Sequence, residues 1–568
     1  MNGSTYSGTP LWTALLAPLG RTGAGAPGVG LAAHALPRVR PSLRSAVSIA
    51  AFVAALAIAA LNEHAPLDIR PGPLGHALAA GIPLLAALVA AYAVARPWPA
   101  LVFVLLLTPC WDAAQVSWEL GPVQVILQTV FIVALALGVL LDAAHDDAVP
   151  KASTRAASAL RPAPAARVRA ATFASHRVGL AATVALLCLA TVSTLRSPDV
   201  EGSLTVLTHG IFEPVAMGVL LLILAGSRRR LALVLIALCL SVALGGAINM
   251  IQSIPAFGSL GELQANRLLF SRLTYFNVGL FGEMLAMAAP MILGALAARR
   301  QLGLGRRAVS ILTIALAMSA AALFLTFSKS AYLATAGGIV TFFLLLATTW
   351  RRRASIVLVS VALSAFVVPW PALVLQVSPT LESAYRSTMV KIVGASRYYS
   401  WDPAKLSGRG SLVERLLATE AAVHMAADHP ILGIGLDQFK SDYVGGYKTA
   451  AAHLSLDSAH TFWPEVAAEL GIPALVLVVL IFASAMLALW RTYRAPPDET
   501  TRLLTLTVLA SLVAWLLVAT AFAGDMYRPW RNMSSDFVMM AVLTAAAFAL
   551  SRGVAAQRRL ATPHIPSG

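Results

Sequence analysis

The sequence predicts an all-α, polytopic integral membrane protein, and three observations lead to this class. Hydrophobic residues make up 58% of the 568-residue chain, and charged residues only 12%. Apolar runs of about 20 residues, the length that a helix needs to cross a bilayer core of about 30 Å, recur from end to end. The links between these runs are mostly short, and every second link is rich in arginine. These features exclude an ordinary soluble protein.

The apolar runs predict about fourteen membrane-spanning helices. They lie near 45–62, 74–95, 98–110, 122–141, 178–195, 205–226, 231–252, 277–298, 308–327, 331–350, 354–375, 465–490, 503–523 and 535–551. The resulting organisation is a cytoplasmic tail at 1–36, helices over 37–375, one large loop at 376–464, helices over 465–551 and a cytoplasmic tail at 552–568. Because the first segment has no basic stretch leading into an apolar run and a cleavage site, it does not resemble a signal peptide.

Arginine and lysine orient the predicted helices. The basic groups start at Arg38, recur at 151–177, 228–230, 299–307, 351–353 and 491–502, and end at Arg559. Fourteen spans place all of them on one side, which the positive-inside rule makes cytoplasmic. The large loop then lies on the opposite side of the membrane. The net charge of +16 therefore reflects topology and contact with anionic membrane lipids, and does not indicate nucleic-acid binding.

Cysteines and acidic residues indicate neither a metal site nor a cofactor. Cys110, Cys188 and Cys239 lie within or at the edge of predicted spans, without metal-ligand spacing. Acidic residues of the outer loop such as Asp437 and Asp442 are too dispersed to suggest a divalent-metal site. We therefore expect no cofactor and chemistry that is independent of metal.

The large loop at 376–464 is the one long polar segment between spans. It holds eight acidic residues, eight basic residues and four of the eleven histidines. Charge is costly inside a bilayer, so a membrane protein with one charged loop usually has its chemistry there. Candidate functional residues are therefore sought first in this loop.

A helix is predicted to begin at Ser411, because Ser411 and Glu414 have the spacing of a capping box. Its apolar side is predicted to be Leu412, Leu416, Val423 and Ala427, and Pro430 and Gly433 should end it.

Arg415 lies in the first turn of that helix, where free backbone N–H groups and a guanidinium together suit phosphate oxygens. Arg409, just before the helix, is a second candidate for the same role. The alternative for both is a solvated arginine on an amphipathic helix.

His460 lies at the end of the loop, directly before an apolar run. An imidazole titrates near pH 6.5 and can accept a proton from a sugar hydroxyl at neutral pH. The alternative is an interfacial histidine beside Phe462 and Trp463, which would then form part of an aromatic belt.

Charged residues near predicted span ends supply the remaining candidates. Lys329 lies in a very short hairpin between two apolar runs, and its alternative is a snorkelling lysine. Arg272, in an external link, is a further candidate for binding phosphate. Glu213 and Glu283 lie within or near spans, where carboxylates are functional candidates by default, but the sequence assigns neither a role.

The order of these elements resembles the O-antigen ligase and O-antigen polymerase superfamily of bacterial inner-membrane glycosyltransferases. The resemblance rests on Arg415, the stretch Pro430-Ile431-Leu432-Gly433-Ile434-Gly435, His460, and Glu469-Leu470-Gly471-Ile472. The segment 326–331 is similar to the family's Ser-Arg motif, and 272–277 to its upstream Arg-to-Asn stretch. The best coverage runs over about 267–480. The sequence departs from the family pattern at three positions. Lys329 stands where the family usually has arginine, and Thr461 stands where it usually has asparagine. Thr419 stands where the family often has an aromatic residue.

The resemblance implies a GT-C type membrane fold and a periplasmic glycosyl transfer. The implied donor is an undecaprenyl-diphosphate-linked glycan, whose diphosphate would be bound by Arg415, Lys329, Arg409 and Arg272. The implied acceptor is another glycan or lipid A–core, with His460 orienting or deprotonating its hydroxyl. Other polysaccharide-assembly proteins are expected partners, and nucleic acid is not.

Ligase and polymerase both remain open, and a polytopic secondary transporter is the competing class. The transporter fits the number of spans, but the sequence has no repeated halves and no paired interrupted helices.

Overall fold

The structure is a computed structural model. It describes residues 47–48, 50, 87–106, 117–120, 123–148, 177–253, 278–326, 328–367, 411–450, 452, 455–456, 458–520 and 535–561. Both predicted tails up to residue 36 and after 561, nearly all of the first predicted span, and the outer loop before Ser411 lie outside these residues. Arg272 and Arg409 lie outside them as well.

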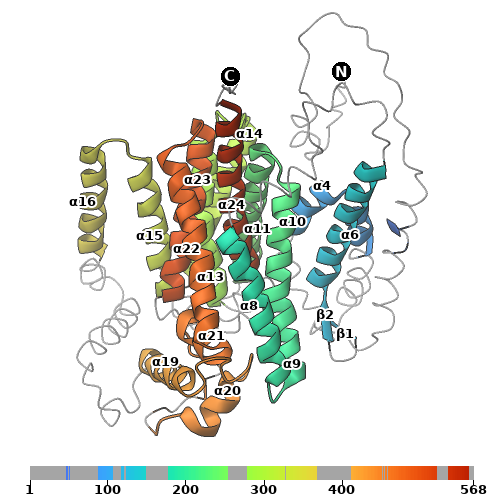
Figure 1. Cartoon of the computed structure of the whole chain (residues 1–568). Coiled ribbons are helices and arrows are strands. Elements are labelled where there is room, and N and C mark those ends of the chain that lie inside the picture. The colour runs from blue at the N-terminus through green and yellow to red at the C-terminus, as the bar shows by residue number, and fades with distance from the viewer. Residues whose placement is uncertain are drawn as a thin grey trace, which may run out of the picture.

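The described elements are almost all helices (Figure 1). In chain order they are α4 (Pro97–Leu106), β1 (Ser117–Leu120), β2 (Val123–Ile126), α6 (Leu127–Ala148), α8 (Arg177–Arg196), α9 (Val200–Val206), η3 (Leu207–Phe212), α10 (Glu213–Leu224), α11 (Arg228–Ser253), α13 (Val278–Ala297), α14 (Arg306–Thr326), α15 (Lys329–Leu346), α16 (Trp350–Val367), α19 (Ser411–Asp428), α20 (Phe439–Asp442), η7 (Tyr443–Tyr447), α21 (Phe462–Leu470), α22 (Ile472–Arg494), α23 (Glu499–Thr520) and α24 (Ser535–Ala561).

The helices agree with a polytopic membrane protein. Among the described residues, six helices are long and apolar enough to cross a bilayer, and five shorter apolar helices accompany them. The six are Arg177–Arg196, Val200–Leu224, Arg228–Ile251, Arg306–Thr326, Ile472–Arg494 and Glu499–Thr520. The second of these is continuous through α9, η3 and α10, in which η3 is a π-helical turn.

The all-α prediction needs one correction near the N-terminal side. Residues 123–126, which we expected to open a membrane span, instead form β2, paired antiparallel with β1. The alternation Val123-Gln124-Val125-Ile126 contains β-branched residues that suit a hairpin as well as a helix, so hydropathy alone did not separate the two.

Polar contacts bring several arginine-rich links together at one end of the bundle. Arg228, the first residue of α11, forms an ion pair with Asp498, which lies between α22 and α23. Arg552 of α24 donates to the carbonyl of Leu222 at 3.3 Å. These links were predicted to share one side of the membrane and lie near one another here; which side that is stays a prediction.

The other end of the bundle carries a small cap made of α19, α20, η7 and α21 (Figure 1). The cap has its own hydrophobic cluster, which includes Leu417, Met425, Phe439 and Tyr443. The predicted span 465–490 is interrupted here, because α21 ends at Leu470 and α22 starts at Ile472. Helix α21 therefore belongs to the cap, and α22 is the helix long enough to cross.

Helix α21 joins the cap to the bundle through two different faces. Phe462, Val466 and Leu470, spaced four residues apart, belong to the core of the bundle. Ala468 belongs to the cluster of the cap. Phe462 also packs against Trp515 of α23, with ring centroids 5.4 Å apart. The cap is thus held to the membrane helices by a packed aromatic contact.

Candidate functional site

Arg415 lies on α19, which begins at Ser411 as predicted. Its side chain is half-buried, and the acidic Glu414 beside it is buried. The apolar side that we predicted for this helix is wrong, since Val423 is 56% exposed. Among the described side chains of α19, the buried ones are Glu414, Leu417, Ala418, Ala421, Ala422, Met425 and Ala426. Small alanine side chains allow close packing. The helix therefore turns this buried side toward the other elements of the cap.

His460 lies in a tight turn just before α21. Its backbone has a φ of +52°, in the left-handed region that residues with a side chain rarely adopt. The His460 N–H donates to the hydroxyl of Ser458 at 3.1 Å. His460 is 9% exposed, and Phe462 after it is buried in protein. The residue is therefore inside the folded chain, and Phe462 is a packing residue there.

Thr419 connects the Arg415 turn to the His460 turn. Its hydroxyl oxygen lies 2.8 Å from the carbonyl of Arg415, one helical turn earlier. The same oxygen lies 3.1 Å from the carbonyl of Ala459 and 2.8 Å from the hydroxyl of Thr461. Ala459 and Thr461 flank His460. The structure thus brings together the two turns that carry the predicted catalytic residues.

The two glycine-containing stretches of the resemblance pack directly on each other. The N–H groups of Ile434 and Gly435 donate to the carbonyls of Ala468 and Glu469, at 2.8 and 3.2 Å. These carbonyls end α21 and would otherwise have no helical partner. Gly433 has a φ of +67°, and a Cβ there would lie 2.3 Å from the backbone of Glu469. This close approach explains the glycine in physical terms.

Hydroxyl groups of the membrane helices hold the same junction. Ser193, near the end of α8, donates toward the carbonyls of Leu432 and Glu469, at 3.0 and 3.2 Å. The hydroxyl of Ser203 on α9 bonds the carbonyl of Leu436. The contact between the stretch 430–435 and the end of α21 is therefore also hydrogen-bonded to α8 and α9.

Glu465 and Glu469 are buried carboxyl groups one turn apart on α21. Burial raises the pKa of Glu465 well above its ordinary 4.5, and the charges of Glu469 and Asp437 raise it further. A backbone hydrogen bond from Ala459 acts in the opposite direction. The N–H of Phe439 donates to Glu469 at 3.3 Å. Within the described part of the chain, no three potential ligands are placed to hold a metal ion.

Glu465 was not among the site residues predicted from the sequence. A signal was present, because two acidic residues with helical spacing follow His460 inside an otherwise apolar segment. Such a pair would face one side of a helix next to the histidine.

The predicted diphosphate-binding residues are described only in part. Lys329 is the first residue of α15, directly after the N-cap Ser328, whose side chain accepts from the N–H of Ala331. The hairpin before it is as short as predicted, because α14 ends at Thr326. Arg409 and Arg272 fall outside the described residues.

The intramembrane carboxylates have different surroundings. Glu213 is buried and lies 2.9 Å from Nδ1 of His209, at the π-helical turn η3. The hydroxyl of Thr129 on α6 also donates to it. Glu283 is buried on α13. Glu213 thus belongs to a polar cluster between helices, away from the His460 turn.

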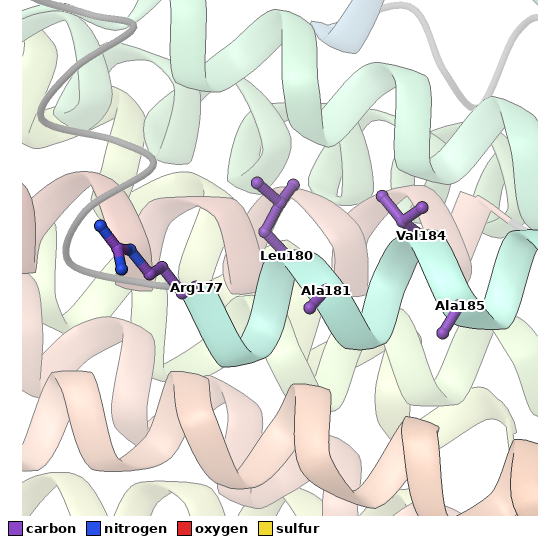
Figure 2. Close-up of a pocket in the computed structure, with 5 residues that line it drawn as sticks. All are labelled: Arg177, Leu180, Ala181, Val184 and Ala185. Atoms are coloured by element: carbon purple, nitrogen blue, oxygen red, sulfur yellow. The ribbon is translucent and has the colours of Figure 1, made fainter.

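A shallow depression on α8 lies outside this site. It is lined by Arg177, Leu180, Ala181, Val184 and Ala185. Figure 2 shows Leu180 and Val184 pointing to the same side of α8. Its lining is apolar apart from Arg177, and Arg177 begins the helix whose other end contacts the cap. The depression contains none of the candidate site residues, and we assign it no function.

Comparison with known proteins finds a family similarity over part of the chain. Residues 314–479 match a family model described as O-antigen ligase. No curated protein matches the chain. The matched segment contains the turns of Arg415 and His460, the bridge through Thr419 and both glycine stretches. Residues 314–479 of the chain are therefore similar to the O-antigen ligase family.

Proposed function

We propose that this protein is a bacterial surface-polysaccharide glycosyltransferase. It transfers or polymerises glycan from an undecaprenyl-diphosphate carrier on the periplasmic face of the inner membrane. The observation that carries the proposal is the contact of the Arg415 and His460 turns through Thr419, within the matched segment. A cation for a phosphate and a base for a hydroxyl are what such a reaction requires.

In the proposed reaction, an acceptor hydroxyl oxygen attacks the anomeric carbon of the donor sugar. The bond from that carbon to the diphosphate breaks, and the leaving diphosphate keeps the electron pair. Positive charge from Arg415, Lys329, Arg409 and Arg272 stabilises the charge that develops there. His460 accepts the proton of the attacking hydroxyl. No divalent metal is assigned to any step.

The acceptor decides between the two activities of the superfamily. A ligase transfers the glycan to lipid A–core, whereas a polymerase transfers it to another lipid-linked repeat. The large loop, with its mixed charges, would lie in the periplasm, where a flipped donor presents its sugar. About fourteen spans with both termini in the cytoplasm complete the proposed topology.

A deletion strain tests the proposal through its surface glycans. Loss of polymer on lipid A, with lipid-linked chains retained, identifies a ligase, and accumulation of single repeats identifies a polymerase. An unchanged glycan profile, with altered uptake or export of a solute, would instead support a transporter and overturn the proposal.

Complementation with Arg415 variants connects the phenotype to the site. Arg415→Ala should not restore the glycan, and Arg415→Lys should restore little, since a point charge lacks the two parallel donors of a guanidinium. Exposed Arg352, at the start of α16, supplies a matched control as Arg352→Ala. Normal glycan from membrane-inserted Arg415→Ala would remove the arginine from the proposed mechanism.

A further inference from the structure

The backbone of Ala459 is held from two sides. Its carbonyl lies 3.1 Å from the hydroxyl of Thr419 on α19. Its backbone also hydrogen-bonds the carboxyl of Glu465 on α21. The same carbonyl also accepts from the hydroxyl of Thr461 at 3.2 Å. Ala459 is fully buried, so water does not supply these bonds and protein groups must. Both restraints act on the residue directly before His460.

His460 has a backbone conformation that needs such restraint. A left-handed φ of +52° is unfavourable for a residue with a Cβ, and persists where surrounding contacts determine it. The hydroxyl of Ser458 accepts from the His460 N–H at 3.1 Å, which supplies a third restraint within the turn. Conformations of this kind gather where a side chain must be aimed at a ligand.

The hydroxyl groups around this turn form a connected hydrogen-bond network. Thr419 has a single hydroxyl proton, although its oxygen lies near the carbonyls of Arg415 and Ala459 and near Thr461. When Thr419 donates that proton to a carbonyl, the Thr461 hydroxyl can donate to Thr419 or, at 3.2 Å, to the carbonyl of Ala459. Thr419 and Thr461, the two departures from the family pattern around the site, are therefore partners of each other.

We propose that Thr419 and Glu465 are positioning residues, which together fix the turn of His460 and align its imidazole with the Arg415 turn of α19. Thr419 holds the turn from the side of α19 and Glu465 from the side of α21. Neither touches the reacting atoms in this proposal. The inference rests on the function proposed above, and adds two residues to its site.

The first test measures transfer kinetics with purified protein and a lipid-diphosphate-linked glycan. Thr419→Val keeps the shape of the side chain but removes the hydroxyl, and Thr419→Ser restores it. We expect Thr419→Val to lower kcat by about 10- to 100-fold, because small misplacements of a catalytic group have effects of that size. The KM for the donor should change little, and Thr419→Ser should recover most of the rate.

Thr505→Val is the matched control. Thr505 is a buried threonine of α23, and its hydroxyl bonds the carbonyl of Thr501 one turn back at 2.7 Å. It has the helix contact of Thr419, but lies on another element. If Thr419→Val has the same kcat as Thr505→Val in an active enzyme, the inference is overturned and the proposed function stands.

A double-mutant cycle tests the pairing of the two threonines. Thr461→Val alone and Thr419→Val alone should each lower kcat, and the double variant should lose little more than the more severe single variant. Losses that multiply would show that the two hydroxyl groups act independently, contrary to the network of bonds proposed here.

The second test measures the turn without using activity. Diethyl pyrocarbonate modifies accessible histidines, and mass spectrometry reports the modification of the peptide with His460. This histidine is 9% exposed and should react slowly in the wild-type protein. Thr419→Val and Glu465→Leu should speed its modification several-fold, while Glu465→Gln, whose amide oxygen accepts the same bond, should not.

Exposed His424 and His429 serve as internal references in the same digest, since their modification should be equal in all variants. Were Glu465→Leu to misfold, buried His209 would also react faster, and the comparison of Thr419→Val with Thr419→Ser would decide. If His460 is modified as slowly in Thr419→Val as in the wild-type protein, the inference is overturned. A wild-type protein that shows this protection but transfers no glycan would contradict the proposed function alone.

Discussion

At the scale of single residues, His460 combines a buried side chain with a left-handed backbone, inside a turn bonded to two helices. A histidine in an aromatic belt would not need such a turn. The position therefore favours a role in chemistry over a role as a membrane anchor.

We expect His460→Ala to lower kcat by about 10²- to 10⁴-fold, the usual contribution of a general base. The affinity for the donor should change little, because a base acts in the transition state. His460→Gln separates the two roles, since glutamine keeps hydrogen bonds but accepts no proton at neutral pH. Steady-state kinetics of both variants, measured across pH, check the prediction.

Exposed His424 on α19 is the matched control for that experiment. The His424→Ala variant should keep the kcat of the wild-type enzyme. Near-normal turnover in His460→Gln would remove histidine from the proton transfer. The cations around the diphosphate would then be the main source of catalysis.

Glu465 makes the stability of the folded protein depend on pH. Burial, with the charges of Glu469 and Asp437, raises its pKa well above 4.5 in the folded state. Between the unfolded and folded pKa values the folded protein binds more protons, so stability falls as pH rises. The thermal midpoint of the wild type in detergent should therefore decrease from acidic pH toward the folded pKa.

Glu465→Gln cannot ionise and should flatten this dependence, with the larger gain in stability at high pH. Glu499→Gln is a suitable comparison, because Glu499 is an exposed carboxylate that pairs with Arg502 at 2.8 Å. A midpoint that rises with pH equally in wild type and Glu465→Gln would contradict the assignment.

At the scale of elements, the junction of Pro430–Gly435 with the end of α21 decides how the cap sits on the membrane helices. Two backbone hydrogen bonds and the close approach at Gly433 hold it. The same junction keeps α21 and α22 as separate helices, since the N–H of Ile472 donates to the carbonyl of Pro430 at 2.9 Å.

Gly433→Ala should destabilise this junction strongly. A left-handed backbone costs a residue with a Cβ roughly 1–2 kcal/mol, before any clash. The added Cβ would also lie 2.3 Å from the backbone of Glu469, which has no flexible end to move away. Thermal unfolding in detergent should show a lower midpoint, and transfer activity should fall with it.

Gly445→Ala in η7 is the control from the same cap. A Cβ at Gly445 would meet nothing within 4 Å, and its φ lies outside the left-handed region. The substitution should leave the midpoint unchanged or raise it slightly. Equal midpoints for the two alanine variants would mean that Gly433 is not held as the structure describes.

At the scale of the whole molecule, the arginine-rich links and the cap lie at opposite ends of the helix bundle. The ion pair of Arg228 with Asp498 marks one end, and the contact of Ser193 with Leu432 marks the other. This arrangement would put catalysis on the face away from the cytoplasm, where a flipped lipid-linked donor presents its sugar.

A topology reporter tests this arrangement in cells. A phosphatase that is active only in the periplasm should be active when fused after Ser407, and silent when fused after Arg353. The reason is that positive residues remain on the cytoplasmic side. The opposite pattern would contradict the function, because a donor on the outer face could not meet a cytoplasmic loop.

The sequence by itself determined the membrane class, the approximate bounds of most described helices, the start of α19 and the segments of the candidate site. These properties depend on local information: runs of apolar residues, their length relative to a bilayer, charges between them and residues that begin or end helices. The family resemblance added the order of Arg415, the glycine stretches and His460.

Only the tertiary structure decided which of these residues meet. Thr419 and Thr461 are 42 positions apart, and each alone reads as a departure from a motif; together they form a 2.8 Å contact. The buried side of α19 was predicted wrongly because its alanines, which hydropathy ranks below leucine and valine, are the residues that allow close packing. Glu465 has its shifted pKa through burial and through neighbours, one of them distant in sequence. Such properties arise when separate segments exclude water from one another, and no local pattern records that.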